Sequence, residues 1–325
     1  MKPIVLVTST KLSDSAKKIF SDAGAEVLYM ADPLNEETLL AQFAAAPINA
    51  VLLRTSPPFT RRVLEGAPHL KIIAKHGAGI DSVDIGVATA RGIVVATAGD
   101  ANADPVAEQS IMFMLTLARD LPQLNRNLRA GKWEKASYQG HEFRGRTVGI
   151  VGFGAIGRRT ARMARALGAN VVLHSRSRIK DAEGMEVEEN FERLLGRVDI
   201  LSLHCPLTDQ TRGMIDGKAL RQMKPTAMLI NTARGGLVDE AALIDALKSG
   251  RLAGAGLDTF AQEPTDPENP LIFLDNVICT PHVAAMTAEA MTRMGTIAAT
   301  TIVGYLQRGE CDRSNVVNLG VLKSI

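Results

Sequence analysis

A glycine-rich stretch near the middle of the chain constrains the fold most strongly. Residues 148–178 read VGIVGFGAIGRRTARMARALGANVVLHSRSR, in which Gly152, Gly154 and Gly157 have the spacing GxGxxG. A β-branched run precedes the glycines, a helical pattern follows them, and a second strand-like run comes within about 30 residues. In such a unit the first glycine permits a tight turn, the second lets backbone amides approach a pyrophosphate, and the third allows helix and strand to pack closely. The stretch predicts a dinucleotide site; a glycine turn without a ligand is the alternative.

The residues that end the second strand of this unit bear on coenzyme choice. An NAD site has an acidic residue there, which binds the ribose hydroxyls and would repel the 2′-phosphate of NADP. This chain has Ser175, Arg176 and Ser177 instead, followed by Arg178. Hydroxyl and guanidinium groups bind phosphate oxygens, so we expect NADP(H) to be preferred, with NAD(H) possible. The other interpretation is that both arginines are solvated loop cations.

Short apolar runs alternate with helical patterns along the chain, which is typical of parallel sheets with crossover helices. One series of runs ends before Gly99, and a second begins near Arg146. Residues 104–133 between them read as one long helical segment, apolar nearly all round in its middle, as in a helix buried by a neighbouring domain or subunit. A last helical stretch over 286–307 can return to the first domain. The sequence therefore predicts an α/β protein of two doubly wound domains.

Composition and charge exclude several classes of partner. A net charge of +2 over 325 residues gives no basic stripe for nucleic acid or a membrane surface. Three scattered cysteines fit neither a disulfide framework nor a metal site, and no signal peptide or membrane span is predicted. We expect a cytoplasmic protein without a metal. Arg158, Arg162 and Arg165 share one helix face, which predicts a solvated face rather than a nucleic-acid contact.

Three further stretches carry residues suited to hydride transfer. Arg234, Glu263 and His282 each follow a strand-like run, hence each should lie at the carboxyl edge of the sheet, where ligands bind in such folds. Arg234 can bind a substrate carboxylate and polarise a keto oxygen, and His282 can donate a proton to the developing alkoxide. Glu263 can orient His282 and favour its protonated form. Taken singly, each also fits an ordinary loop residue.

These stretches together identify a family. KHGAGIDSVD, ADPVAEQ, RGRTVGIVGFGAIGR, LHCPLT, NTARGGLVDE, GLDTFAQEP and TPHVAA occur in this order over nearly the whole chain. They resemble the D-isomer-specific 2-hydroxyacid dehydrogenases, which include glyoxylate/hydroxypyruvate reductases and phosphoglycerate dehydrogenases. The resemblance implies a flavodoxin-like substrate-binding domain (1–99 and 285–325), an inserted Rossmann cofactor domain (100–284) and a homodimer built on the cofactor domain.

The resemblance also implies roles for individual residues. It makes Arg234, Glu263 and His282 the catalytic trio and Asp258 a nicotinamide contact. The substrate is expected to meet the amides of Gly77, Ala78 and Gly79, together with Arg54 and Arg234. The remaining expected cofactor contacts are Ala155, Ile156, Cys205, Pro206, Thr211 and Thr232.

Several functions remain open from the sequence. An NADPH-dependent reductase of glyoxylate or hydroxypyruvate that yields the D-2-hydroxy acid is favoured, because Ser175 stands where NAD-dependent members carry an acidic residue. A 3-phosphoglycerate dehydrogenase without a regulatory domain is the alternative, with Arg54 and Lys75 as candidate phosphate contacts. A non-enzymatic dinucleotide-sensing corepressor or scaffold is the third possibility, since a fold does not determine function. His76, beside the expected substrate loop, is a rival proton donor to His282.

Overall fold

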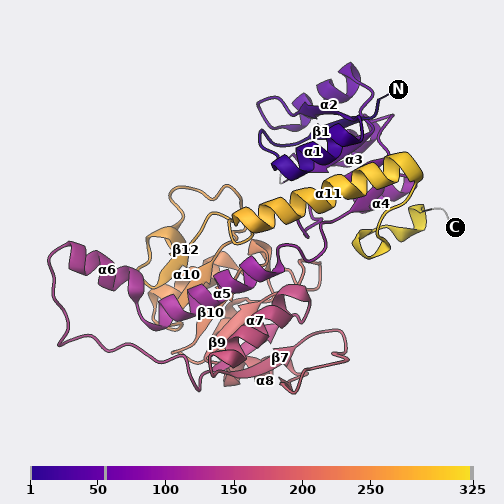
Figure 1. Ribbon diagram of the computed structural model, residues 1–325. Helices are drawn as coiled ribbons and strands as arrows, with labels where there is room; N and C mark the ends of the chain where they lie inside the picture. Colours follow the sequence, from indigo (N-terminus) through magenta and orange to yellow (C-terminus); the bar gives the residue numbers. More distant parts are fainter. Residues whose placement is uncertain (1, 55–56, 323–325) are drawn as a thin grey trace. The chain divides into compact units, whose positions relative to one another are not determined.

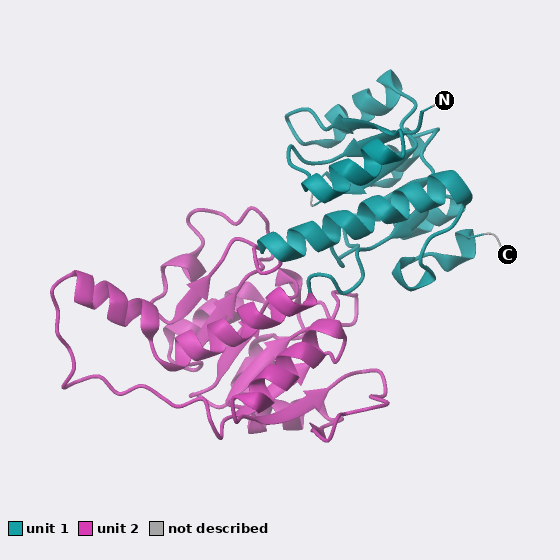
Figure 2. Ribbon diagram, in the orientation of Figure 1, with its two compact units in different colours: residues 1–102, 286–325 teal, residues 103–285 magenta. Residues whose placement is uncertain are grey.

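The chain divides into two compact units (Figure 2). The computed structural model describes residues 2–54 and 57–322. Unit 1 contains the described residues of Met1–Asn102 and Met286–Ile325, and unit 2 is Ala103–Ala285. The boundaries expected from the sequence followed residues 99 and 284.

Unit 1 is built on a parallel sheet of five strands in the order β2-β1-β3-β4-β5. The strands are β1 (Ile4–Val7), β2 (Glu26–Tyr29), β3 (Ala50–Leu53), β4 (Ile72–Lys75) and β5 (Val94–Ala96). β3, β4 and β5 are buried at every position, which agrees with their continuous apolar runs, since a parallel sheet is covered on both faces. The strand order is the flavodoxin-like order expected for this unit.

Helices cover both faces of this sheet (Figure 1). α1 (Asp14–Asp22) and α11 (Ala288–Arg308) pack on one face, and α2 (Glu36–Ala45), α3 (Arg61–Glu65) and α4 (Ile85–Ala90) pack on the other. Two 3₁₀ turns, η3 (Arg313–Asn315) and η4 (Leu319–Val321), follow α11.

The last long helix starts and stops where its capping residues require. The Thr287 side chain accepts a hydrogen bond from the Ala290 amide at the start of α11, and Gly309 ends the helix in the left-handed region at φ 72°. α11 packs on the sheet of unit 1, so this stretch returns to the first unit, as its pattern allowed.

Unit 2 contains a parallel sheet of seven strands in the order β12-β11-β10-β9-β6-β7-β8. The strands are β6 (Thr147–Val151), β7 (Asn170–His174), β8 (Glu186–Val187), β9 (Ile200–Leu203), β10 (Met228–Asn231), β11 (Gly254–Leu257) and β12 (Val277–Cys279). The chain runs outward from β6 first to one side and then, from β9, to the other. This reversal creates the switch point at which doubly wound sheets bind dinucleotides.

The helices of unit 2 also form two layers. α5 (Ala103–Ala118) and α7 (Ala155–Ala166) pack on one face of the sheet, and α8 (Phe191–Arg197), α9 (Gly217–Gln222) and α10 (Glu240–Lys248) pack on the other. Two 3₁₀ segments, η1 (Gly235–Leu237) and η2 (Pro270–Phe273), lie in loops after β10 and β11. Over residues 2–54 and 57–322, no helix is long and apolar enough to cross a membrane.

The prediction of a single helical segment over 104–133 was wrong. α5 ends at Ala118, and a separate helix, α6 (Leu121–Arg129), begins after Asp120, whose φ of 48° lies in the left-handed region. Pro122 at the start of α6 has no amide hydrogen to continue the hydrogen-bond ladder of α5, so the two helices separate there. Met112, in the apolar middle of α5, is 51% exposed within this chain.

Candidate active and coenzyme sites

The glycine loop after β6 has the geometry that a pyrophosphate requires. Gly152 has φ 95°, and a Cβ there would lie 2.7 Å from the backbone oxygen of His204, so no other residue fits easily. A Cβ on Gly157 would lie 2.0 Å from the Gly152 oxygen, which explains the close packing of α7 on the loop. A Cβ on Gly154, by contrast, would meet nothing within 4 Å.

Gly154 is the N-cap of α7, and no side chain caps this helix. Ala155, Ile156 and Gly157 form its first turn, whose amides point out of a helix N-terminus and favour an anion. The loop therefore fits the dinucleotide that the spacing predicted.

The loop after β7 carries the expected ribose contacts. Ser175 is half-buried, whereas Arg176, Ser177 and Arg178 are exposed. Nη1 of Arg176 donates a hydrogen bond to Oε1 of Gln210, in the turn after β9. Burial raises the pKa of the Cys205 thiol, at the end of β9, and a backbone hydrogen bond and the Arg176 charge partly oppose this.

Two of the expected cofactor contacts have hydroxyls engaged within the protein. Thr211 Oγ1 donates to the Pro206 oxygen at 2.8 Å and accepts from the Thr208 amide at 2.8 Å, which braces the turn after Cys205. Thr232, at the end of β10, shares a buried 2.8 Å hydrogen bond with Ser110 of α5. Both residues shape the loops at this sheet edge, and their direct contact with a cofactor stays a prediction.

Arg234 is positioned by the turn that follows β10. Asn231 Nδ2 donates to the Arg234 oxygen at 2.9 Å, and the Ala233 amide donates to Asn231 Oδ1 at 3.1 Å. A Cβ on the next residue, Gly235, would lie 1.9 Å from the carbonyl carbon of Phe260. This close approach brings the loop that carries Arg234 against the loop that leads to Glu263.

The buried carboxylate of Asp258 organises the loop that carries His282. Asp258 is 1% exposed and directly follows β11. Its Oδ1 accepts from Thr280 Oγ1 at 2.5 Å and from the Val283 amide at 2.9 Å, and its Oδ2 accepts from the Ala284 amide at 3.0 Å. These bonds flank His282 on both sides. Thr280 was not singled out in the sequence, because only the fold brings it to Asp258.

His282 and Glu263 form a hydrogen-bonded pair. Glu263 Oε2 lies 2.7 Å from His282 Nδ1, and Glu263 Oε1 accepts from the Phe260 amide at 3.1 Å. His282 has φ 53°, a left-handed conformation that is strained for a non-glycine residue and is retained mainly at functional sites. A carboxylate on Nδ1 places the donated hydrogen there, so Nε2 is the ring atom left to exchange a proton with a substrate.

The electrostatics join Arg234 to this pair. Burial raises the pKa of the Glu263 carboxyl, but the hydrogen bond from His282, the Phe260 amide and the Arg234 charge outweigh it, so the pKa is lowered overall. Glu263 is therefore ionised at neutral pH. Glu263 and His282 thus form a hydrogen-bonded pair, and the charge of Arg234 acts on the same carboxylate. These three residues, which follow strands at the carboxyl edge of the sheet, are the candidate catalytic cluster.

In unit 1, His76 is a poor candidate for the proton donor. Burial, with the charges of Arg54 and Lys75, lowers the pKa of His76 to about 4, so the ring is neutral at neutral pH. Its Nε2 lies 3.2 Å from the Met291 oxygen and is engaged there as a donor. The ring therefore joins the end of β4 to α11.

The expected substrate residues of unit 1 follow β3 and β4. Arg54 is half-buried, its guanidinium donating to Ser9 Oγ at 3.0 Å and to the Met291 sulfur at 3.8 Å, and burial lowers its pKa. Gly77 has φ 146° and precedes Ala78 and Gly79 in the loop after β4. A Cβ on Gly77 would meet nothing within 4 Å.

Replacing Glu263 with glutamine should move the alkaline limb of the pH profile for keto-acid reduction to lower pH, because activity is lost when His282 gives up its proton. The protonated imidazole of His282 loses its anionic partner, so it loses its proton more easily. The lowered pKa of Glu263 means that the wild-type partner stays ionised through the weakly acidic range. Steady-state rates across pH measure the shift. A profile that does not move would show that Glu263 only positions the ring.

The coenzyme-binding region matches a family profile. Residues 111–284 match the sequence profile described as "D-isomer specific 2-hydroxyacid dehydrogenase, NAD binding domain". The D-3-phosphoglycerate dehydrogenase of Methanocaldococcus jannaschii is 39% identical over 97% of this chain, but the chain spans only 59% of that relative. The glyoxylate reductase of Thermococcus litoralis is 37% identical over 100% of this chain and 99% of its own length.

A solved structure is also similar to this chain over its whole length. The NADPH-dependent glyoxylate/hydroxypyruvate reductase of Sinorhizobium meliloti, in complex with NADP and malonate, superposes with a TM-score of 0.88 at 29% identity, covering 100% of this chain and 99% of the other. Sequence and fold agree along the whole chain. The protein belongs to the D-isomer specific 2-hydroxyacid dehydrogenase family, whose members are NAD(P)-dependent dehydrogenases and reductases.

Proposed function

We propose that this protein reduces a small 2-keto acid, glyoxylate or hydroxypyruvate, to the D-2-hydroxy acid with NADPH. The observation that carries the proposal is the bond between Glu263 and His282 Nδ1, with the charge of Arg234 acting on the same carboxylate. That arrangement leaves His282 Nε2 as the proton donor, and Arg234, whose charge reaches the same carboxylate, as the cation for a substrate carboxylate. A dinucleotide-sensing corepressor would need neither group, so the cluster favours the enzyme.

Each residue of the cluster has a separate task in the proposed reaction. The Arg234 guanidinium binds the substrate carboxylate and polarises the keto oxygen. His282 Nε2 donates a proton to that oxygen as negative charge develops on it, while Glu263 stabilises the protonated ring. NADPH, when bound, supplies the hydride to the keto carbon. The amides of Gly77, Ala78 and Gly79 are the other predicted carboxylate contacts.

Arg176 supports the choice of NADPH. Arg176 lies in the loop after β7, where an acidic residue would accept hydrogen bonds from the ribose hydroxyls of NAD. Its neighbours in the sequence, Ser175 and Ser177, offer hydroxyls. Replacing Arg176 with alanine should raise the Michaelis constant for NADPH at least about tenfold, since charge-assisted contacts to the 2′-phosphate are lost. The constant for NADH should change little. Equal effects on both coenzymes would make Arg176 an ordinary loop cation; Arg193→Ala, an exposed arginine on α8, is the control.

A 3-phosphoglycerate dehydrogenase is the second candidate, favoured by the half-buried cation of Arg54. Its partners Ser9 and Met291 are neutral, so its charge stays available to a phosphate. Lys75 is less suited, because it is buried and its ammonium donates to Ser82 Oγ at 3.1 Å. NADPH use argues for reduction, since cells generally hold this coenzyme reduced.

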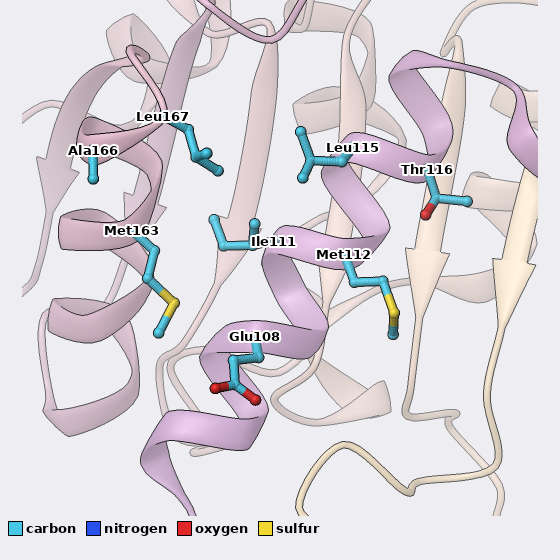
Figure 3. A pocket seen from close by; sticks show the side chains of 8 residues that line it. All are labelled: Glu108, Ile111, Met112, Leu115, Thr116, Met163, Ala166 and Leu167. Carbon is cyan, nitrogen blue, oxygen red and sulfur yellow. The ribbon is translucent and has the colours of Figure 1, made fainter.

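We also propose that a second copy of the chain covers an apolar hollow on unit 2. Residues of α5 and α7 line a hollow of about 550 Å³, with Met112, Leu115 and Leu167 on its walls (Figure 3). These three side chains are 51%, 36% and 43% exposed, which is unusual for adjoining apolar groups on a monomer. Sedimentation equilibrium should give twice the chain mass of 34.8 kDa, and Leu115→Lys should lower it to that of one chain. A monomeric wild type would contradict the dimer.

A further inference from the structure

We propose that Gln210 is a positioning residue that sets the preference for a 2′-phosphorylated coenzyme by holding the Arg176 guanidinium without neutralising it. This inference rests on the proposed use of NADPH. It concerns a residue that neither the glycine spacing nor the loop after β7 pointed to. Gln210 lies 34 residues beyond Arg176, and the contact exists only in the folded protein.

The order of strands in the sheet shows that the contact between Arg176 and Gln210 joins the loops on either side of β6. Arg176 follows β7 and Gln210 lies in the turn after β9, and β6 is the strand between β7 and β9 in the sheet. The hydrogen bond from Arg176 Nη1 to Gln210 Oε1 therefore spans the end of β6, where the glycine loop begins. The two side chains connect the loops that flank the dinucleotide site at the switch point. Arg176, although exposed, is thereby tied to the loop after β9.

The turn that carries Gln210 is internally braced. Thr211 is 2% exposed, and its hydroxyl binds the Pro206 oxygen and the Thr208 amide. The Arg212 amide donates to the Thr208 oxygen at 2.9 Å, and the Gly213 amide donates to the Gly236 oxygen at 2.9 Å. These bonds fix the backbone from which Gln210 projects, so the turn presents Gln210 toward Arg176 from a defined position.

A neutral acceptor suits this position better than a carboxylate. One amide oxygen accepts from one guanidinium nitrogen, so the other donors of Arg176 and its full charge stay available to a phosphate. The arginines of α7 illustrate the opposite case. Arg158 and Arg162 both bind the carboxylate of Glu183, at 2.5 and 2.6 Å, and lower its pKa to about 2. Their charge is already balanced by an anion, whereas the partner of Arg176 is uncharged.

The test compares Gln210→Glu with Gln210→Ala in the full-length protein. Glutamate has nearly the same shape as glutamine but pairs with Arg176 as an anion and repels phosphate. It should lower kcat/KM for NADPH at least about tenfold through KM, with kcat retained and NADH affected less than about twofold. Alanine removes only the positioning and should cost about threefold with NADPH. Inhibition by adenosine 2′,5′-bisphosphate should weaken in parallel, and inhibition by AMP should not.

Two controls separate this role from a general effect on structure. Gln123 on α6 binds Arg126 at 2.7 Å in a similar surface pair, and Gln123→Glu should leave the ratio of NADPH to NADH efficiency unchanged. In the Arg176→Ala background, Gln210→Glu should lose most of its effect on NADPH, because the two residues act as a unit.

Each possible outcome decides the proposal. A full effect of Gln210→Glu in the Arg176→Ala background, or equal losses with NADPH and NADH, would overturn the role of Gln210 while leaving NADPH use intact. A wild-type enzyme that prefers NADH would overturn both the role and the coenzyme assignment. A loss in Gln210→Glu that is confined to NADPH and requires Arg176 would establish the role of Gln210.

Discussion

Replacing His282 with alanine should lower kcat for keto-acid reduction by about a hundredfold to ten-thousandfold, the usual contribution of a general acid. The ring is the proton donor of the cluster, held by Glu263 at 2.7 Å through Nδ1. Coenzyme affinity should be preserved, because the glycine loop and Arg176 lie at other strand ends of the sheet. Steady-state kinetics should therefore show a strongly lowered kcat, and titration of protein fluorescence should show normal coenzyme binding.

The matched control for this variant is His76→Ala. The structure gives His76 a pKa of about 4 and a hydrogen bond to Met291, so the change should not remove a proton donor. It should leave kcat within about tenfold of the wild type, well short of the loss expected for general acid catalysis. Unchanged turnover in His282→Ala together with a large loss in His76→Ala would reverse the two assignments.

Replacing Arg234 with glutamine should lower kcat/KM for the keto acid by about a hundredfold to a thousandfold. The variant removes the cation that binds the carboxylate and stabilises charge on the keto oxygen, and groups of this kind contribute about that much. Arg234→Lys keeps the charge but lacks the planar two-nitrogen fork, so it should recover only part of the loss.

The Arg234 variants should also alter the cluster itself. The Arg234 charge is one of the causes that lower the pKa of Glu263, so that carboxyl should protonate at a higher pH in Arg234→Gln. Arg193→Gln on the surface of α8 is the control. It should change neither kcat/KM for the keto acid nor the pKa of Glu263. A wild-type KM and kcat in Arg234→Gln would remove Arg234 from the mechanism.

Much of the fold could be predicted from local patterns. The strands β3, β4, β9 and β10 are mainly apolar runs that are buried at every position, so their residue types identify them. β8 was missed because it has two residues, Glu186 and Val187, both exposed. The break between α5 and α6 was missed, although Pro122 was a signal against one unbroken helix.

In the candidate site, too, some features could be predicted from local stretches and others depend on the fold. Arg234, Glu263 and His282 were identified from their stretches, each of which follows a strand. The structure bonds Glu263 to His282, and the Arg234 charge acts on the same carboxylate. Contacts between distant loops had no local signal. Asp258 has both carboxylate oxygens bonded to the loop around His282, and its expected contact with the nicotinamide stays a prediction.

The partners of Arg158, Arg162 and Arg165 on their helix face also had no local signal in the sequence. This face was predicted to be solvated, because the spacing alone contains no partner. The first two arginines bind the Glu183 carboxylate, and Arg165 donates to the Glu183 backbone oxygen at 2.6 Å. Arg162 and Arg165 are exposed, as predicted, and the three arginines also fix the loop between β7 and β8 to α7.

The most direct test is the steady-state kinetics of the purified protein with NADPH and three substrates: glyoxylate, hydroxypyruvate and 3-phosphohydroxypyruvate. We predict that kcat/KM for glyoxylate or hydroxypyruvate exceeds that for the phosphorylated acid, and that NADPH is used more efficiently than NADH. A clear preference for 3-phosphohydroxypyruvate, abolished by Arg54→Ala, would contradict the proposal and identify the protein as a 3-phosphoglycerate dehydrogenase.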